Sequence, residues 1–263
     1  MADEHPRNLG PKGCTSEPQD ASMHSAEPGA TFEEDFVRVL AIGAHPDDIE
    51  LGCGGSLAAH RGLGDEIALL VLTTGEQGPQ AAASRVDEQD QAAAKLGAAL
   101  VWGSFDDGAV PEGRPTIDLI QRVMHDFAPD VIYTHAANDT HQDHRATALA
   151  TSAAARRACR ILRYESPTTT VFTPNVFVDI EHLLDQKVEL ICAHVSQVLK
   201  NGLVDVDAVE AQARYYGFKA RVHLAEGFET DRFVWGLGTE RDGEDRLEFD
   251  LRRPEAFDVV ALR

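Results

Sequence analysis

Short apolar runs alternate with longer segments of helical period along most of the chain. Residues 36–43, 66–73 and 129–135 are continuous β-branched and apolar runs, which are typical of strands buried on both faces. Further strands are expected at 98–103, 160–165 and 175–180, and helices at 85–97, 116–127, 145–159, 183–199 and 207–218. Because strands and helices alternate, the pattern predicts an α/β fold: a Rossmann-like, mostly parallel sheet with helices on both faces.

The two ends of the chain lack this pattern. Residues 1–31 are rich in Pro, Gly, Ser and charge and hold no apolar stretch of a secretory signal, so we expect a disordered N-terminal segment. Residues 32–228 are expected to form one domain, and residues 229–263 a C-terminal extension that is loosely attached to it or packed on it. No run approaches the roughly 18 apolar residues of a transmembrane helix, so no membrane span is expected.

Two polar clusters follow two of the predicted strands. His45, Asp47 and Asp48 come directly after the first strand. The second cluster follows the fourth strand and contains Asn138, Asp139, His141, Asp143 and His144. In a doubly wound sheet of order 3-2-1-4-5 these strands are neighbours at the switch point, where ligands bind beyond the carboxyl ends of strands. The fold therefore brings both clusters to one crevice, with a metal site at the C-terminal ends of strands 1 and 4.

Both clusters contain the residue types of a catalytic zinc site. Imidazole nitrogen and carboxylate oxygen are the usual zinc ligands besides thiolate, and a catalytic zinc keeps three protein ligands and one open position. Two imidazoles and one carboxylate supply that number, and one more carboxylate can serve as the base. Two structural alternatives stay open. Asp47 or Asp48 could cap the helix that begins near Ile49, and the second cluster could be a solvated turn that caps the next helix.

The glycines after the first cluster do not indicate a nucleotide site. A dinucleotide-binding turn needs GxGxxG straight after the strand, but here His-Pro-Asp-Asp fills the turn and Leu57 stands in place of the third glycine. Acidic residues at that turn would also repel a pyrophosphate. We therefore exclude an NAD-linked oxidoreductase and interpret residues 52–55 as allowing close approach of neighbouring groups around the site.

Composition excludes further classes of partner. The chain has 44 acidic against 24 basic residues and a formal net charge of −20, which argues against nucleic acid or an anionic membrane as the main partner. Its four cysteines are widely spaced without a CxxC pair, so they predict neither a disulfide framework nor a thiolate zinc site. They are typical of reduced thiols and favour a cytoplasmic location. The sequence leaves a homo-oligomer open.

Several motifs together resemble the LmbE-like, or PIG-L-type, zinc deacetylase family. They are AHPDD, GCGG, TTGEQG, RVDEQDQAAAKLG, HQDH, HVSQV and AEGF, and they extend from about residue 37 to residue 228. The resemblance implies a zinc-dependent hydrolase that removes an acetyl group from an N-acetyl amino sugar, such as N-acetylglucosamine, or from a sugar conjugate. It implies Zn²⁺ as the cofactor, a small-molecule acetamido sugar as the partner, and acetate and a free amine as products.

The resemblance also implies a role for each residue of the two main motifs. In the family pattern, His45, Asp48 and His144 would bind zinc, and Asp47 would be the general base. His141 would stabilise the oxyanion or protonate the leaving amine. Asp143 would orient His141 and tune its basicity.

Other positions match the family less specifically. Arg85 matches a substrate-contacting arginine, although a helix-surface arginine paired with Glu88 or Gln89 is an equal alternative. Asp106 or Asp107 falls where some members contact a sugar hydroxyl, and we take Asp107 as the candidate against the alternative of a solvated loop. The remaining match, HxSQ, comprises His194, Ser196 and Gln197 and is expected to support the site rather than to react.

One departure from the family narrows the range of functions. The mycothiol deacetylase has a catalytic tyrosine just before its HxDH motif, whereas this chain reads NDTHQDH without one. This weakens an assignment to mycothiol biosynthesis and leaves His141 as the oxyanion partner. Two other functions stay open: an amidase or deacylase of a thiol conjugate or natural-product intermediate, and a non-catalytic metal- or sugar-binding protein. Asp47 speaks against the latter, because metal binding does not need that carboxylate.

Overall fold

The computed structural model describes residues 36–78, 82–158, 160–198, 204–230 and 233. They belong to a compact unit that begins at Phe36. The predicted N-terminal segment 1–31 and nearly all of the predicted extension 229–263 lie outside the described residues. None of the described helices is long and apolar enough to cross a bilayer.

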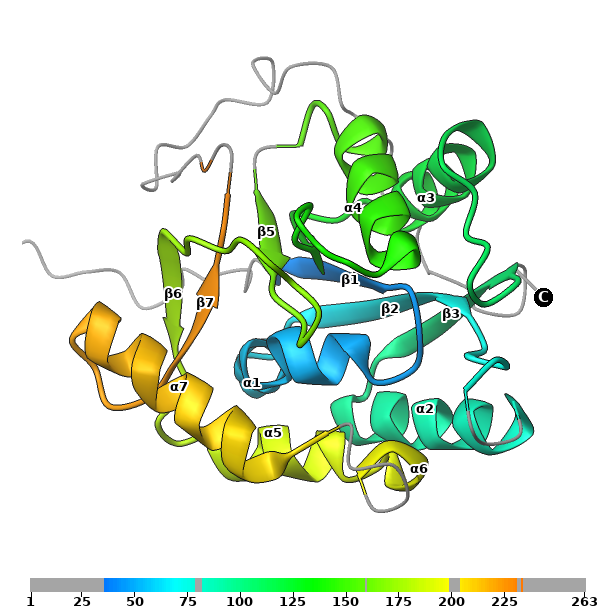
Figure 1. The fold of residues 1–263 in the computed structure, drawn as a ribbon. Coiled ribbons are helices and arrows are strands. Elements are labelled where there is room, and N and C mark those ends of the chain that lie inside the picture. Colours follow the sequence, from blue (N-terminus) through cyan, green and yellow to red (C-terminus); the bar gives the residue numbers. More distant parts are fainter. Residues whose placement is uncertain (1–35, 79–81, 159, 199–203, 231–232, 234–263) are drawn as a thin grey trace, which may run out of the picture. The chain divides into compact units, whose positions relative to one another are not determined.

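The core of the fold is a five-stranded, wholly parallel sheet (Figure 1). Its strands are β1 (Arg38–Gly43), β2 (Glu66–Thr73), β3 (Ala99–Phe105), β4 (Val131–His135) and β5 (Ile161–Tyr164), in the order β3-β2-β1-β4-β5. This confirms the predicted order 3-2-1-4-5. The strands that precede the two polar clusters, β1 and β4, are neighbours in the sheet, paired over 39–41 and 131–133.

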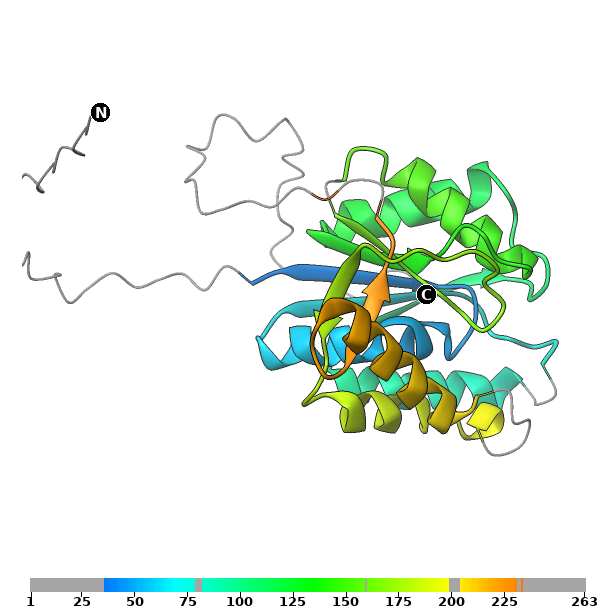
Figure 2. The same cartoon turned by 60° about the vertical axis from the view of Figure 1, so that its left-hand side comes forward.

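Helices cover both faces of the sheet, as predicted. On one face lie α1 (Asp48–Gly62), α2 (Ala82–Leu96), α5 (Leu184–Ile191) and α6 (Val195–Val198), and on the other α3 (Arg114–Phe127) and α4 (Gln142–Ala154) (Figures 1 and 2). Alternate residues of β1 point to opposite faces, as a strand requires. Val39 and Ala41 pack in the core under α1, whereas Leu40 and Ile42 pack in the core under α3 and α4. Burial on both faces explains why the strand reads as an unbroken apolar run.

The structure differs from the sequence prediction at two places near the C-terminal part. The strand expected at 175–180 forms as β6 (Val176–Asp179), but it pairs antiparallel with β7 (Ala225–Phe228) in a separate ribbon that packs against α7 (Val206–Ala220). The single helix expected at 183–199 is two helices, α5 and α6. The break directs Ser196 to the Glu88 carboxylate, which accepts hydrogen bonds from its amide at 2.9 Å and its hydroxyl at 2.6 Å.

Helix α1 is interrupted at Cys53, whose backbone is not helical (φ −144°, ψ 17°). The Glu226 carboxylate accepts hydrogen bonds from the amides of Gly55 (2.9 Å) and Ser56 (2.7 Å), so it caps the helix where it restarts. Lys187 is fully buried, pairs with Glu226, and donates to the Leu51 carbonyl at 2.7 Å. The AEGF motif therefore has a structural role in shaping α1.

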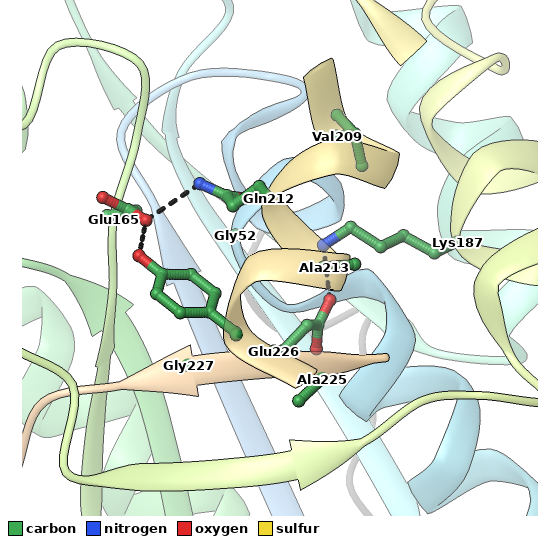
Figure 3. Close-up of a pocket in the computed structure, with 10 residues that line it drawn as sticks. Gly52, Glu165, Lys187, Val209, Gln212, Ala213, Ala225, Glu226 and Gly227 are labelled. Atoms are coloured by element: carbon green, nitrogen blue, oxygen red, sulfur yellow. Dashed lines mark hydrogen bonds and ion pairs between the residues drawn. The ribbon is translucent and has the colours of Figure 1, made fainter. Parts of the chain in front are cut away.

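A small cavity lies beside this ion pair (Figure 3). It is lined on one side by Lys187 and Glu226 and on the other by Glu165, whose carboxylate accepts a hydrogen bond from Gln212 at 2.9 Å. Its volume of about 10 Å³ leaves room for at most one water molecule, so the cavity is too small for a sugar.

Gly52 is the glycine of GCGG that the packing requires most. A Cβ at Gly52 would lie 2.2 Å from the Tyr164 ring, which is fully buried and donates from its hydroxyl to the Ile42 carbonyl at 2.8 Å. We expect Gly52→Ala to lower the free energy of unfolding by about 1–3 kcal/mol, the usual cost of overpacking.

Gly62, in the last turn of the same helix, is the matched control for this prediction. A Cβ there meets nothing within 4 Å, so Gly62→Ala should leave stability unchanged or raise it slightly. Urea unfolding of both variants measures the difference. Equal stability of the two variants would mean that the Tyr164 ring moves aside at no cost.

Candidate active site

The first polar cluster occupies the turn between β1 and α1. Asp47 precedes the helix in a left-handed conformation (φ 93°, ψ −25°), and its side chain makes no capping hydrogen bond. Asp48 is the first residue of the helix, and its Oδ2 accepts a hydrogen bond from the His45 amide at 2.7 Å. Neither carboxylate caps α1, so capping does not explain this cluster.

The second cluster runs from the end of β4 into the first turn of α4. His141 is the N-cap residue of α4, and its Nδ1 accepts a hydrogen bond from the Asp143 amide at 3.3 Å. Asp143 and His144 in the first turn are buried, as is Asp139 in the preceding loop. Capping therefore explains one interaction of His141, but a solvated turn does not explain three buried ionisable side chains.

The structure brings together the three residues that the family pattern would assign to a metal. His45 Nδ1 lies 3.3 Å from Asp48 Oδ2, and His144 Nε2 lies 3.4 Å from Asp48 Oδ1. Among the described residues, overlapping groups with ligand atoms within 4.8 Å of one another are His45 with His141 and His144, Asp48 with His135 and His144, and His45 with Asp107 and Asp143. Asp47 belongs to none of them.

Carboxylates fix the orientation of both imidazoles from outside. His45 Nε2 lies 3.1 Å from Asp107 Oδ1 and 3.1 Å from Asp143 Oδ2. His144 Nδ1 lies 3.1 Å from Asp139 Oδ2. A proton on each outer nitrogen satisfies these contacts and leaves the inner nitrogen, Nδ1 of His45 and Nε2 of His144, as a lone pair facing Asp48.

The electrostatics of this cluster favour a cation. Burial alone would lower the pKa of both histidines, but the hydrogen bonds that His45 donates to the carboxylates of Asp107, Asp143 and Asp48 hold its pKa well above its usual range. Asp48 and Asp139 raise the pKa of His144 to about 9 in the same way. Once a metal displaces the protons on the inner nitrogens, two imidazoles and one carboxylate form the donor set of a catalytic divalent-metal site, so His45, Asp48 and His144 fit such an ion.

Asp47 lies beside this cluster and is held apart from it. Its side chain is only 13% exposed, and its Oδ1 is 3.5 Å from Arg85 Nη2. Burial and the neighbouring Asp48 charge raise the pKa of Asp47 to about 6, against the opposing charges of His194, Arg85 and His45. A carboxylate whose pKa lies close to neutrality is suited to accept and return a proton.

His141 lies beside His144, with its ring stacked on the His144 ring at a centroid distance of 4.5 Å. Because its Nδ1 accepts from the Asp143 amide, a neutral His141 carries its proton on Nε2 and can donate from there. Burial and the charges of His144 and His45 lower the pKa of His141. The ring is therefore a hydrogen-bond donor in its neutral form.

The predicted partner of His141, the Asp143 carboxylate, contacts other groups. Its oxygens accept from the amides of Gly108 (2.7 Å) and Val110 (3.1 Å), and Oδ2 contacts His45. The Asp143 carboxylate therefore acts on His141 only through its charge, which opposes the lowering of the pKa of His141, while the Asp143 amide fixes the tautomer of the ring. Residues two apart at a helix start point in different directions, which accounts for the difference.

The two predicted substrate contacts are both buried. Arg85 is 6% exposed, so the alternative of a helix-surface arginine is wrong. It donates to the carbonyls of Pro46 (2.7 Å) and Gly75 (3.1 Å). Asp107 is 7% exposed and contacts His45, whereas Asp106 beside it is exposed. The solvated-loop alternative therefore applies to Asp106 and not to Asp107.

Sequence reasoning gave no role to three residues of the site. Asp139 orients His144, as described above. His135 ends β4 and stacks on the His144 ring at 4.1 Å; its Nε2 accepts from the Ala44 amide at 3.1 Å and lies 3.2 Å from Asp48 Oδ2. Glu50 lies 3.3 Å from His194 of the HxSQ motif, and the charge of His194 opposes the rise in the pKa of Asp47. The one indication in the sequence that His135 belongs to the site is that this polar residue ends a buried strand.

The double contact on His45 Nε2 gives a prediction about Asp107. We expect Asp107→Asn to weaken metal affinity by about tenfold, the lower end of the usual range for partners of metal ligands, because Asp143 still accepts from the same nitrogen. Asp106→Asn is the matched control and should leave affinity unchanged. Competition with a chelator measures both dissociation constants. Equal constants in the two variants would show that Asp107 does not orient His45.

The fold and the site together define an α/β protein with a candidate metal site at the carboxyl ends of its central strands and a separate carboxylate beside it. The chain belongs to the PIG-L (LmbE-like) family of N-deacetylases. The family's profile, described as GlcNAc-PI de-N-acetylase, matches residues 40–155. These residues include both polar clusters, the whole of β4 and most of β1.

Relatives and solved structures agree with this membership. The chain is 38% identical over 151 residues to the uncharacterized deacetylase YaiS of Escherichia coli K12, covering 54% of this chain and 82% of YaiS. It is 26% identical over 230 residues to the diacetylchitobiose deacetylase of Thermococcus kodakarensis, covering 77% and 85%. The crystal structure of the conserved protein TT1542 from Thermus thermophilus superposes with a TM-score of 0.69 at 28% identity, covering 78% of this chain and 100% of TT1542.

Proposed function

We propose that the protein is a zinc-dependent hydrolase that removes the acetyl group from an N-acetyl amino sugar or a sugar conjugate and releases acetate and a free amine. One observation carries the proposal above the others. The facing nitrogens of His45 and His144 lie 3.3 Å and 3.4 Å from the Asp48 carboxylate, while Asp47 belongs to none of the groups of converging ligand atoms among the described residues. Metal binding alone has no use for that fourth group, so its presence favours an enzyme over a metal-binding protein.

The metal would be held by His45, Asp48 and His144. When bound there, a divalent ion such as zinc supplies a Lewis acid that lowers the pKa of water and polarises a carbonyl. We choose zinc because two imidazoles, one carboxylate and an open position are its usual catalytic donor set. Iron or another divalent metal also accepts these ligands, so metal analysis decides between them.

Asp47 and His141 would divide the proton chemistry. Asp47 accepts a proton from the water that attacks the acetamide carbonyl. His141 donates a hydrogen bond from Nε2 to the carbonyl oxygen as that oxygen becomes negative, which stabilises the transition state. The proton held by Asp47 then passes to the departing amine as the C–N bond breaks. The proton taken from the water therefore ends on the amine, and Asp47 returns to its ionised form.

The substrate class rests on the relatives. The diacetylchitobiose deacetylase is named for an acetylated amino sugar, and the family profile is named for GlcNAc-PI. We extend this class, N-acetylglucosamine compounds included, to the present chain. Another relative, 28% identical, is named as a mycothiol S-conjugate amidase, which is why the amidase alternative is tested below. The cytoplasmic location and a homo-oligomer stay predictions from the sequence.

A substrate screen tests the proposal. The purified chain with one equivalent of zinc is incubated with N-acetylglucosamine, N,N'-diacetylchitobiose and an N-acyl thiol conjugate, and acetate and free amine are measured together. Release of both from an acetamido sugar, abolished by a chelator, supports the proposal. Turnover of the thiol conjugate alone would instead support the amidase alternative. A metal-loaded protein that cleaves no amide would leave the non-catalytic binding function.

A further inference from the structure

The turn that carries Asp47 has a backbone conformation that its residue type rarely adopts. Asp47 has φ 93°, whereas residues other than glycine almost always keep φ negative. The other described non-glycine residues with positive φ, which are Ser104, Ala128 and Arg221, lie outside the cluster of metal-ligand candidates. Such a conformation persists only where the surrounding structure holds it, and it is common at functional sites.

Arg85 of α2 is the group that holds this turn. Its guanidinium donates to the Pro46 carbonyl, which is the peptide oxygen directly before Asp47, at 2.7 Å. A second donor bonds the Gly75 carbonyl in the loop after β2 at 3.1 Å. The Asp47 carboxylate itself is 3.5 Å away. The Arg85 guanidinium therefore contacts the turn after β1, the loop after β2 and the Asp47 carboxylate at the same time.

The slot for this guanidinium is built by glycines. A Cβ at Gly75 would lie 2.1 Å from Arg85 Nη1, and one at Gly78 would lie 3.0 Å from the same atom. Gly75 also has a positive φ of 65°, which suits glycine. The TTGEQG motif thus leaves room for Arg85 at the back of the HPDD turn.

A second residue of α2 holds the same turn from its amide side. Gln89 Oε1 accepts from the Asp47 amide at 3.3 Å, and Gln89 Nε2 donates to Glu50 Oε1 at 2.8 Å. Glu50 is fully buried in the first turn of α1. Arg85 and Gln89 lie four residues apart, on one face of the helix. Helix α2 therefore holds the turn through the carbonyl before Asp47 and through the amide of Asp47 itself.

We propose that Arg85 is a positioning residue, which fixes the strained Pro46–Asp47 peptide and so aims the Asp47 carboxylate, rather than a residue that binds substrate. The inference rests on the proposed function, because it assigns Arg85 its effect through the general base. Two observations separate it from a substrate-contacting role. Arg85 is 6% exposed, and both of its terminal nitrogens already donate to backbone carbonyls.

Lysine is the informative replacement for Arg85. It keeps the positive charge near Asp47, but a single ammonium cannot donate in the planar, two-pronged geometry that reaches Pro46 and Gly75 together. We expect Arg85→Lys to lower kcat by about 10- to 100-fold, since a small misplacement of a reacting group has effects of that size. KM should stay within about threefold and metal content should stay at the wild-type value.

The matched control is Arg61→Lys. Arg61 lies at the opposite end of α1 and also links α1 to α2, by donating to the Lys95 carbonyl, but it is exposed and remote from the site. This variant should retain wild-type kcat and KM. Gln89→Met provides a second variant, should Arg85→Lys fold poorly, because it releases the Asp47 amide and should also lower kcat with little change in KM.

Three outcomes overturn the proposal. A raised KM with unchanged kcat in Arg85→Lys would make Arg85 a substrate contact. Wild-type kinetics in both Arg85→Lys and Gln89→Met would show that the turn keeps its shape without them. In a crystal structure of Arg85→Lys, an Asp47 φ still near its wild-type value would contradict the proposal as well.

The crystal structure also separates this proposal from the proposed function. If the wild type cleaves no amide, the proposed function fails, and the backbone of Asp47 in Arg85→Lys alone decides the positioning role. An Asp47 φ that has left the left-handed region supports it.

Discussion

Asp47→Asn is expected to retain the metal and the fold but to lose turnover by about two to four orders of magnitude, the usual range for removal of a general acid–base group. Asparagine has nearly the shape of aspartate and is among the residues best able to adopt a left-handed backbone, so the strained turn survives. It cannot accept a proton from water. The rate of acetate release and the metal content, measured on the same sample, check the prediction.

Asp48→Asn is the matched variant, since it makes the same chemical change one residue further along. An amide is a poor ligand for zinc, so this variant should lose metal together with activity. A near wild-type rate in Asp47→Asn would end the assignment of Asp47 as the base. Metal loss in Asp47→Asn but not in Asp48→Asn would exchange the roles of the two aspartates.

The central sheet was predictable because each step rested on local pattern. The run at 36–43 has no polar position between Val39 and Ile42. An uninterrupted apolar run of this kind indicates a strand that is buried on both faces. Alternation with helices then requires parallel pairing. The antiparallel ribbon of β6 and β7 was less predictable, because Val176 and Phe228 pair across 52 positions of sequence and four-residue strands carry little pattern.

The side chains that meet at the site were predictable, but their pairings were not. His45, Asp48 and His144 follow strands that had to be neighbours, so topology alone brings them together. Which carboxylate supports which imidazole depends on how loops turn. Asp107 reaches His45 from the loop after β3, and Asp139 reaches His144 from the loop after β4. Neither loop has a periodicity from which such directions follow.

The same limit explains why the sequence did not suggest the positioning role that we propose for Arg85. Its position in α2 is visible in the sequence, and an arginine near a predicted active site suggests an anionic or polar substrate. The carbonyls it binds, at Pro46 and Gly75, belong to two different turns, and backbone acceptors leave no trace in the residue types. Only the buried geometry distinguishes an arginine that binds substrate from one that holds the chain.

His144→Ala should remove the metal, while His141→Ala should keep it and lose turnover. The two rings are stacked at 4.5 Å and both lie at the start of α4. Each alanine variant therefore serves as the control for general damage to the fold in the other variant. His144 directs Nε2 at Asp48 and has its outer nitrogen held by Asp139. His141 directs Nδ1 at a backbone amide and retains only Nε2 for the site.

We expect wild type and His141→Ala to contain about one divalent ion per chain, and His144→Ala to bind metal at least 100-fold more weakly, beyond the roughly 10- to 100-fold effect of losing a residue that merely supports a ligand. Elemental analysis and chelator competition measure both quantities. His45, His141 and His144 also form one of the groups of converging ligand atoms, so the reverse result has a definite meaning. Metal loss in His141→Ala with metal retention in His144→Ala would make His141 the metal ligand and His144 the residue that stabilises the oxyanion.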